Sequence, residues 1–157
     1  MHYKLARRQS PGIRWAVVET PGMVARADEL ATERLRFFPD IDSAAAWLGK
    51  IDLVHSNSAL QYTPDPPATL KRLCGINAQT MYWARLWLTD KSQRESQTSY
   101  LSDNGPSLSL GLPEKLVRYE RTSITLADFL AAHCNYTLRD RGPDWFCFSL
   151  PNDQVFS

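Results

Sequence analysis

The chain has 157 residues, and its 18 lysines and arginines nearly balance 17 acids, which leaves a net charge of +1 at pH 7. That balance excludes a general attraction for nucleic acid or acidic lipid, so we expect neither partner, and the 43% hydrophobic content excludes a disordered chain. The length favours one domain over residues 1–157, and because no apolar run resembles a membrane span or a signal peptide, we expect a soluble, cytoplasmic protein.

The first part of the chain alternates helical and strand patterns. The run RWAVVE at 14–19 is compact, rich in valine and closed by an acid, which is typical of a buried parallel strand. Residues 35–39, LRFFP, predict the next strand. Helical spacing or composition predicts three helices, at 2–9, 23–32 and 43–48.

Capping residues and further apolar runs continue this alternation. Asp42 is expected to cap the helix at 43–48, and the run IDLVH at 51–55 predicts another buried strand. Asp65 followed by Pro66 predicts a helix start, because proline fits the first helical turn. Residues 80–88, TMYWARLWL, fit a central strand.

The last part begins with a polar segment and ends with a hairpin. Residues 89–111 are rich in serine and glutamine and predict a long mobile loop that acts as a lid. A brief strand at 116–119 and a helix at 126–133, opened by Thr125 and Asp128, follow. Two strands around a turn at Arg141, Gly142 and Pro143 form the predicted hairpin, at 136–139 and 145–150.

Strands that alternate with helices predict an α/β fold with a mostly parallel sheet, to which the closing hairpin adds an antiparallel edge. Three cysteines are widely spaced and odd in number, so they indicate neither a disulfide framework nor a metal site.

Three segments resemble class I S-adenosylmethionine-dependent methyltransferases. RWAVVETPGMVARADEL resembles the second-strand motif of these enzymes, FFPDI the third and DLVHSNSALQYTPDPPATLKRL the fourth. The chain is most similar to a bacterial group of methyltransferase-like proteins that contain such a VVE and ALQY pair. The resemblance implies a Rossmann-like three-layer sandwich whose last strand runs antiparallel.

The resemblance also implies a set of cofactor-binding residues. Glu19, at the end of its strand, would accept hydrogen bonds from the ribose hydroxyls of S-adenosylmethionine, although it could instead cap the next turn. Asp40 would accept from the adenine amino group with Ile41 covering the ring, although an Asp before a helix is often only a cap. Ser56 and Asn57 would approach the methionine part of the cofactor.

Four further residues are candidates for substrate contact or catalysis. Gln61 and Tyr62 are expected to contact the acceptor, although Tyr62 could equally lie in the core. His55 has a side chain that titrates near neutral pH and is a weak candidate for a general base. Arg85 either pairs with a buried acid or points into the cleft, because an unpaired buried charge is costly. Its spacing from Trp83 and Trp87 predicts that the three share one face of a strand.

One part of the family pattern is missing. A methyltransferase of this fold has a first strand and a glycine-rich turn, but HYKLARR before residue 14 resembles the helix that follows such a turn. We therefore expect an N-terminal truncation, through a mistaken gene start, an artificial deletion or a decayed gene. The strands at 14–19 and 51–55, which would flank the missing first strand in the sheet, would then pair directly or leave open edges. Open edges favour self-association.

These observations leave alternative functions open. The parent protein is expected to transfer a methyl group from S-adenosylmethionine to a small-molecule or glycan acceptor. The alternative is a non-catalytic remnant or interaction module that has lost cofactor binding. A dehydrogenase would also place an acid after this strand, but the ALQY turn and the terminal hairpin argue against it.

Overall fold

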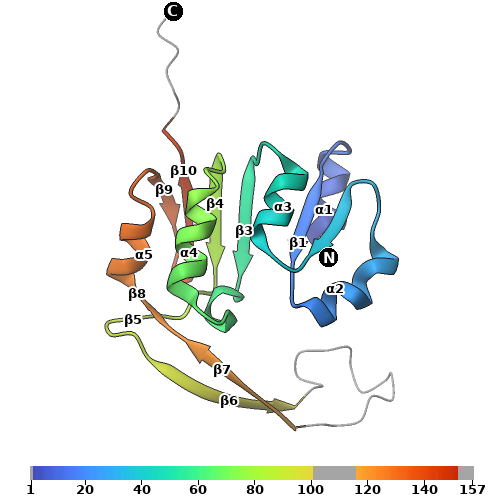
Figure 1. Ribbon diagram of the computed structural model, residues 1–157. Helices are drawn as coiled ribbons and strands as arrows, with labels where there is room; N and C mark the ends of the chain where they lie inside the picture. The colour runs from blue at the N-terminus through green and yellow to red at the C-terminus, as the bar shows by residue number, and fades with distance from the viewer. Residues whose placement is uncertain (1, 101–115, 152–157) are drawn as a thin grey trace, which may run out of the picture.

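The computed structural model describes residues 2–100 and 116–151, with side chains described from Ala6 onward. In this part of the chain, helices alternate with short strands that form four separate small sheets (Figure 1). The fold is therefore mixed α/β, as the sequence predicts. None of the described helices is long and apolar enough to span a membrane.

The N-terminal elements form a two-stranded parallel sheet with helices against it. Val18 pairs with Phe38, and Arg14 lies over the ring of Trp47 and donates to its carbonyl, which fixes the helix end to the first strand. The predicted helices and strands in this region are confirmed. They are α1 (His2–Gln9), β1 (Trp15–Val18), α2 (Pro21–Ala27) with η1 (Asp28–Leu30), β2 (Leu35–Phe38) and α3 (Ile41–Leu48).

The cap of α3 differs from the prediction. Asp40, not Asp42, is the N-cap: its two carboxylate oxygens accept from the backbone N–H and the hydroxyl of Ser43, each at 2.8 Å. Asp42 lies in the first turn and forms an ion pair with Arg72 of the next helix. The prediction was wrong by two residues, because Asp40 also lies where its carboxylate can reach the N–H of the third helical residue, Ser43.

The second sheet has the order β3-β4-β10-β9 (Figure 1). The strands β3 and β4 are parallel, and β10 is antiparallel to both β4 and β9. The predicted hairpin is confirmed, but its second strand lies inside the sheet and its first strand forms the edge. The four strands are β3 (Leu53–Asn57), β4 (Thr80–Ala84), β9 (Thr137–Arg141) and β10 (Trp145–Ser149).

Two predicted helix starts above this sheet are confirmed. Asp65 accepts from the N–H of Ala68 and opens α4 (Pro66–Gly75). Thr125 accepts from the N–H of Asp128 and opens α5 (Leu126–Ala132). Because side-chain caps satisfy backbone donors that a helix leaves open, each start is fixed by its own sequence.

The main hydrophobic core lies between α4, α5 and the second sheet. At its centre, Trp83 Nε1 donates to His133 Nε2 at 2.9 Å, and His133 Nδ1 bonds the Phe129 carbonyl at 2.8 Å. Both ring nitrogens are thus used, and the imidazole is neutral because burial lowers the pKa of His133. The buried core residues are Leu60, Leu70, Cys74, Ala78, Met81, Trp83, Ile124, Phe129 and Phe148.

The strand predicted over residues 80–88 is divided. It ends at Ala84 because Arg85 adopts a left-handed backbone conformation with φ 52°. After this break, β5 (Leu88–Thr89) pairs in parallel with β8 (Ile124–Thr125) instead of continuing the sheet. The prediction that Trp83, Arg85 and Trp87 share one strand face is therefore wrong.

The segment predicted as a long loop contains a strand. Residues Arg94–Tyr100 form β6, which pairs antiparallel with β7 (Leu116–Thr122), so the loop prediction is wrong for this stretch. The last part of the predicted loop, residues 101–111, lies outside the described residues. The polar strand β6 has no apolar periodicity, so it could not be recognised as a strand from the sequence.

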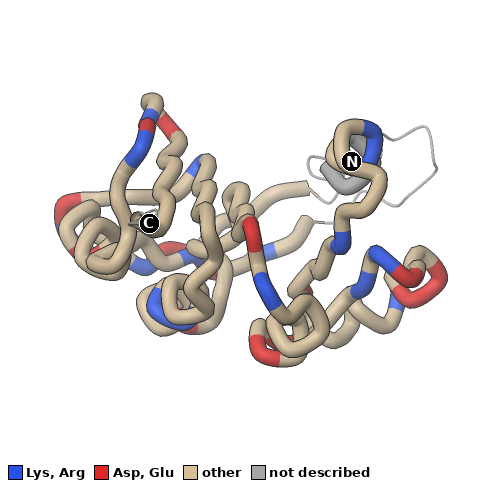
Figure 2. The backbone as a smooth tube through the Cα atoms, turned by 90° about the horizontal axis from the view of Figure 1, so that it is seen from above, with Lys and Arg blue, Asp and Glu red and all other residues tan. Residues whose placement is uncertain are grey.

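The sheets are covered mainly from one side. Helices α3, α4 and α5 lie on one face of the strands and α1 lies on the other, and acidic and basic residues intermingle over these elements (Figures 1 and 2). Among the described strands, β1 pairs only with β2, and β3 pairs only with β4. Of the two predicted alternatives, direct pairing or open edges, direct pairing between β1 and β3 is thus not formed. The segments α2, η2 (Leu60–Tyr62) and β5, which follow β1, β3 and β4, lie along one edge of the molecule, at the bottom of Figure 1.

Candidate functional site

A network of polar groups joins the carboxyl ends of β3 and β4. The backbone N–H of Ser58 donates to the carbonyl of Ala84 at 2.9 Å. The side-chain Nε2 of Gln61 donates to Ser58 Oγ at 3.1 Å and to the Arg85 carbonyl at 3.3 Å. Because ligands of parallel α/β sheets lie beyond the carboxyl ends of the strands, this edge is the natural place for a site.

Two residues of this network have unusual backbone conformations. Ser58 has φ 54° and Arg85 has φ 52°, although neither residue is a glycine. The left-handed region costs a residue with a side chain about 1 kcal/mol or more, and such residues cluster at functional sites. The two strands therefore end in matching strained turns that hold the network in place.

The amide of Gln61 leaves one buried oxygen without a partner. A carbonyl can only accept, so the bond to the Arg85 carbonyl fixes Nε2 on that side and turns Oε1 away from it. Gln61 is 5% exposed, and within the described residues Oε1 has no hydrogen-bond partner. An unsatisfied buried acceptor costs about 1–3 kcal/mol, which a packing role alone does not explain.

Arg85 is held by three hydrogen bonds while its side chain stays exposed. Its backbone N–H donates to the Asp144 carbonyl at 2.7 Å, and its carbonyl accepts from Gln61. Its Nε donates to Asn57 Oδ1 at 2.7 Å. The prediction offered a buried acid or the cleft; the structure has Arg85 exposed and bonded to a neutral amide.

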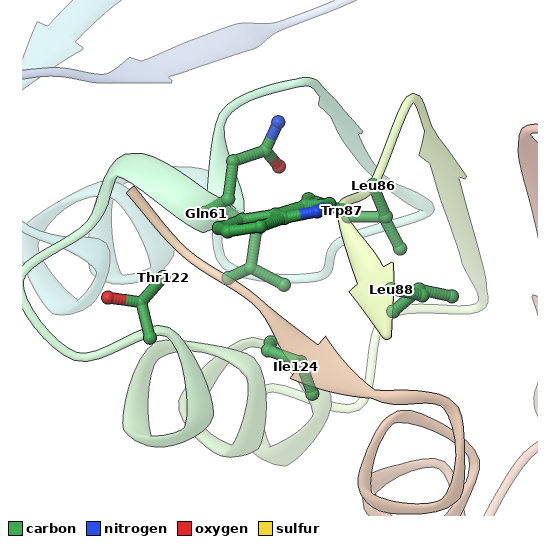
Figure 3. Close-up of a pocket in the computed structure, with 7 residues that line it drawn as sticks. Gln61, Leu86, Trp87, Leu88, Thr122 and Ile124 are labelled. Atoms are coloured by element: carbon green, nitrogen blue, oxygen red, sulfur yellow. The ribbon is translucent and has the colours of Figure 1, made fainter. Parts of the chain in front are cut away.

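The aromatic ring of Trp87 lies next to this network. Figure 3 shows the indole between the amide of Gln61 on one side and Leu88 and Ile124 on the other. The hollow that these side chains line has an empty volume of about 160 Å³ but consists of crevices narrower than a water molecule. Arg121 of β7 lies over the same indole, 4.1 Å from the ring centre. This hollow is part of the packing beneath the site and does not hold a ligand.

The hairpin of β6 and β7 contacts the site through Tyr62. The hydroxyl of Tyr62 donates to Gln97 Oε1 at 3.1 Å, and its ring meets the ring of Tyr119 edge-on at 5.6 Å. Tyr62 is 41% exposed, so it is a surface residue at the site and not a core residue. Gln97 could not be predicted as its partner, because its strand was expected to be a loop.

The candidate base His55 packs against aromatic side chains of the second sheet. Its ring stacks on Tyr82 of β4, 5.7 Å between centres, and Tyr82 stacks in turn on Trp145 of β10. Successive side chains of a strand point to opposite faces, so His55 and Tyr82 lie on the face opposite Trp83. Ser56, which pairs with Trp83, is half-buried on the core side. By the same alternation, His55 lies on the face of β3 that also carries Asn57, the partner of the Arg85 side chain.

The predicted ribose and adenine residues lie at the carboxyl end of the other sheet. Glu19 follows β1, donates its N–H to the Phe38 carbonyl, and is exposed. Within the described part of the chain, its carboxylate accepts one hydrogen bond, from the N–H of Thr20 at 3.4 Å. Asp40 caps α3, and its hydrogen bonds from Ser43, backbone first, lower the pKa of its carboxyl group. Ile41 is half-buried at the start of α3.

The predicted residues therefore form two groups, one on each sheet. Glu19 and Asp40 end neighbouring strands of the first sheet, while Asn57, Gln61 and Arg85 form the network of the second. Sequence reasoning missed the strained turn at Ser58, which has no glycine to indicate it. In the described part of the chain, no cluster of three His, Cys, Asp or Glu side chains could hold a metal ion.

A second hollow, in which about 390 Å³ is open to water, lies between the α2–η1 segment and β2. It is bordered by Asp28, Thr32 and Arg36 together with apolar side chains. The hydroxyl of Thr32 already accepts from the N–H groups of Arg34 and Leu35, so it is committed to a turn. Arg36 lies over the ring of Trp47, 5.5 Å from its centre, so two of the three polar side chains that border this hollow already have partners.

Comparisons of the chain with protein-family models, with curated protein sequences and with solved structures found no match in any of the three.

Proposed function

We propose that the chain is the main part of a class I S-adenosylmethionine-dependent methyltransferase domain, and that the parent protein methylates a small molecule or glycan. The observation that carries the proposal is the strand order, with β2-β1 in one sheet and β3-β4-β10-β9 in the other. Put side by side, they match a mostly parallel Rossmann-like sheet with an antiparallel last strand and one central strand missing.

The missing strand would lie between β1 and β3. Residues 2–9, which precede β1, form a helix and not a strand with a glycine turn. Large apolar side chains are exposed at the two facing strands: Val18 on β1 is 42% exposed and Leu53 on β3 is 48% exposed. A strand added between them would unite the halves into the three-layer sandwich that the resemblance implies.

In this proposal the two groups of residues bind the two ends of the cofactor. Glu19 fits its role, because its exposed carboxylate has lone pairs available for the ribose hydroxyls. Asp40 fits less well, because each of its two carboxylate oxygens already accepts one hydrogen bond from Ser43. To bind adenine, one of these oxygens would have to accept a second hydrogen bond, from the amino group of the base. Ser56 and Asn57 would approach the methionine part, and Gln61 and Tyr62 the acceptor.

The bound cofactor would supply an activated methyl group, so the protein needs mainly to align donor and acceptor. Holding two reactants in a reactive geometry can itself contribute several kcal/mol of rate acceleration. Methyl transfer by this domain therefore does not require His55 to act as a general base. The strained and hydrogen-bonded turns at Ser58 and Arg85 provide the rigid edge that such alignment requires.

Calorimetric titration with S-adenosylhomocysteine tests this function. Saturable binding to the 157-residue chain is expected if the two halves already form the cofactor site. A second protein, extended at its N-terminus by an apolar strand and a glycine turn, should bind more tightly. Absence of binding in both proteins would contradict the proposal.

A non-catalytic remnant or interaction module is the alternative, and the separation of the two sheets favours it. If β1 and β3 keep open edges, their unpaired backbone groups favour pairing with another chain. The original chain should then sediment as an associated species, whereas the extended protein should be more monomeric and melt at a higher temperature. Equal melting and a monomeric original chain would show that no strand is needed there.

A further inference from the structure

The guanidinium group of Arg85 is oriented but only partly used. Its Nε donates to the neutral side chain of Asn57, and its backbone is fixed on both sides by Asp144 and Gln61. Within the described residues, its two terminal nitrogens have no hydrogen-bond or ion-pair partner. The four N–H donors on those nitrogens form a planar fork on an exposed residue that directly follows β4.

Three other arginines in the described chain form ion pairs, whereas Arg85 does not. Arg72, Arg94 and Arg121 each pair with an acid, at Asp42, Glu120 and Glu95 respectively. Arg85 is instead anchored by a neutral amide, as Arg118 and Arg139 are by serine hydroxyls, but among these three only Arg85 has a left-handed backbone. An exposed charge needs no partner for stability. A left-handed backbone conformation, however, costs free energy for a residue with a side chain, so stability alone does not explain an arginine at position 85.

Resting on the proposed function, we propose that Arg85 binds a carboxylate group of the methyl acceptor. The two terminal nitrogens of a guanidinium present parallel N–H bonds that match the two oxygens of a carboxylate. Because Nε is occupied by Asn57, the ligand meets the end of the fork and not its side. This narrows the acceptor from any small molecule or glycan to one that carries an acidic group.

Asn57 and Gln61 are positioning residues in this site. Asn57 fixes the guanidinium plane through Nε, and Gln61 fixes the backbone of Arg85 through its carbonyl. Both belong to the segment that leaves β3, so they connect the anion site to the residues expected near the methyl donor. A carboxylate held by Arg85 would therefore place the rest of the acceptor along the ends of β3 and β4.

The test is a nuclear magnetic resonance titration of the full chain with benzoate, benzamide and inorganic phosphate. Benzoate should shift the Nε–H signal of Arg85 saturably, benzamide should not, and phosphate should bind more weakly than benzoate. Arg85→Gln should weaken benzoate binding by about tenfold or more, as expected for a charge-assisted bidentate pair. Arg85→Lys, which keeps the charge but loses the fork, should weaken it less.

Arg139→Gln is the matched control. Arg139 is also exposed and also donates its Nε to a neutral side-chain oxygen, that of Ser149, but it lies on the edge strand β9. The control should leave benzoate binding unchanged. No saturable shift at Arg85, or equal binding of benzamide, would overturn the proposal without any variant having to fold. Phosphate binding as tight as benzoate binding would overturn the choice of a carboxylate.

A parallel titration with S-adenosylhomocysteine separates this proposal from the proposed function. Benzoate binding without S-adenosylhomocysteine binding would retain the anion site and reject methyl transfer. The reverse result would reject only the anion site. S-adenosylhomocysteine itself carries a carboxylate that Arg85 could bind in place of the acceptor. If Arg85 binds the acceptor, the affinity for S-adenosylhomocysteine should be unchanged in Arg85→Gln. A loss of that affinity would assign Arg85 to the cofactor and overturn its assignment to the acceptor.

Discussion

The half of the molecule built on β3, β4, β10 and β9 has a closed core, whereas the half built on β1 and β2 does not. Among the described residues, Ala44 is the one buried hydrophobic residue that precedes Leu60. In the first half, Met23 is 50% exposed and Leu30 is 59% exposed. The proposed ribose and adenine ligands thus belong to the half that depends most on a further element for its packing.

The largest expected difference between the halves is in stability. Phe129→Ala removes a side chain at the centre of the core and should lower the free energy of unfolding by about 3–5 kcal/mol. Phe37→Ala, at a half-buried position of β2, should cost about 1–2 kcal/mol. Urea unfolding of both variants measures this difference, and equal losses would refute the comparison.

Near neutral pH, the pH dependence of stability should be a property of the second half, through His133. His133 has a lowered pKa in the folded state, so below its ordinary pKa near 6.5 the unfolded chain binds a proton that the folded chain does not. Stability should therefore be complete above about pH 6.5 and fall as the pH drops from there towards the folded pKa. His133→Gln should cost about 1–3 kcal/mol at pH 7.5 and remove most of this slope between pH 7 and 5.5. A slope unchanged by the substitution would assign the pH dependence to other groups.

The sequence predicted those elements whose signals are local. Asp65 with Pro66, and Thr125 with Asp128, fix their helices through bonds within three residues, and both starts were correct. Arg85 carries no such signal, because its left-handed turn depends on the carbonyl of Asp144, which lies far along the chain. Strand β6 likewise exists only through its pairing with β7.

The candidate site was predicted in part for the same reason. Gln61, Asn57 and Arg85 were each named from the sequence, but their mutual bonds required the parallel pairing of β3 and β4. The weak candidate base, His55, stacks on Tyr82, a contact that depends on the pairing of β3 with β4 and that the sequence alone could not predict. Residue types were therefore predictable, and their orientation was not.

A binding measurement can show whether the loosely packed half has a function. In a protein extended by the apolar strand and glycine turn, Glu19→Ala should weaken S-adenosylhomocysteine binding by about 1.5–3 kcal/mol, the range for hydrogen bonds to a charged group. Glu33→Ala removes an exposed acid from the loop before β2 and is the control. Unchanged affinity in a folded Glu19→Ala variant would remove Glu19 from the site.

The smallest expected effect separates the two roles of Asp40, helix cap and adenine ligand. Asp40→Ala loses the cap of α3 and should lower the melting temperature by about 2–4 °C, whereas Asp40→Ser keeps a capping oxygen and should melt as the original does. Because hydrogen bonds from Ser43 lower the pKa of Asp40, its stabilising effect should be present above its ordinary pKa, near pH 4, and be lost as the pH falls further. A serine hydroxyl is too short to reach an adenine amino group from the same backbone position. If Asp40 also binds adenine, Asp40→Ser should therefore weaken S-adenosylhomocysteine binding in the extended protein without any change in melting. If affinity follows the melting temperature in both variants, Asp40 is only a cap, and recognition of the base belongs to other residues.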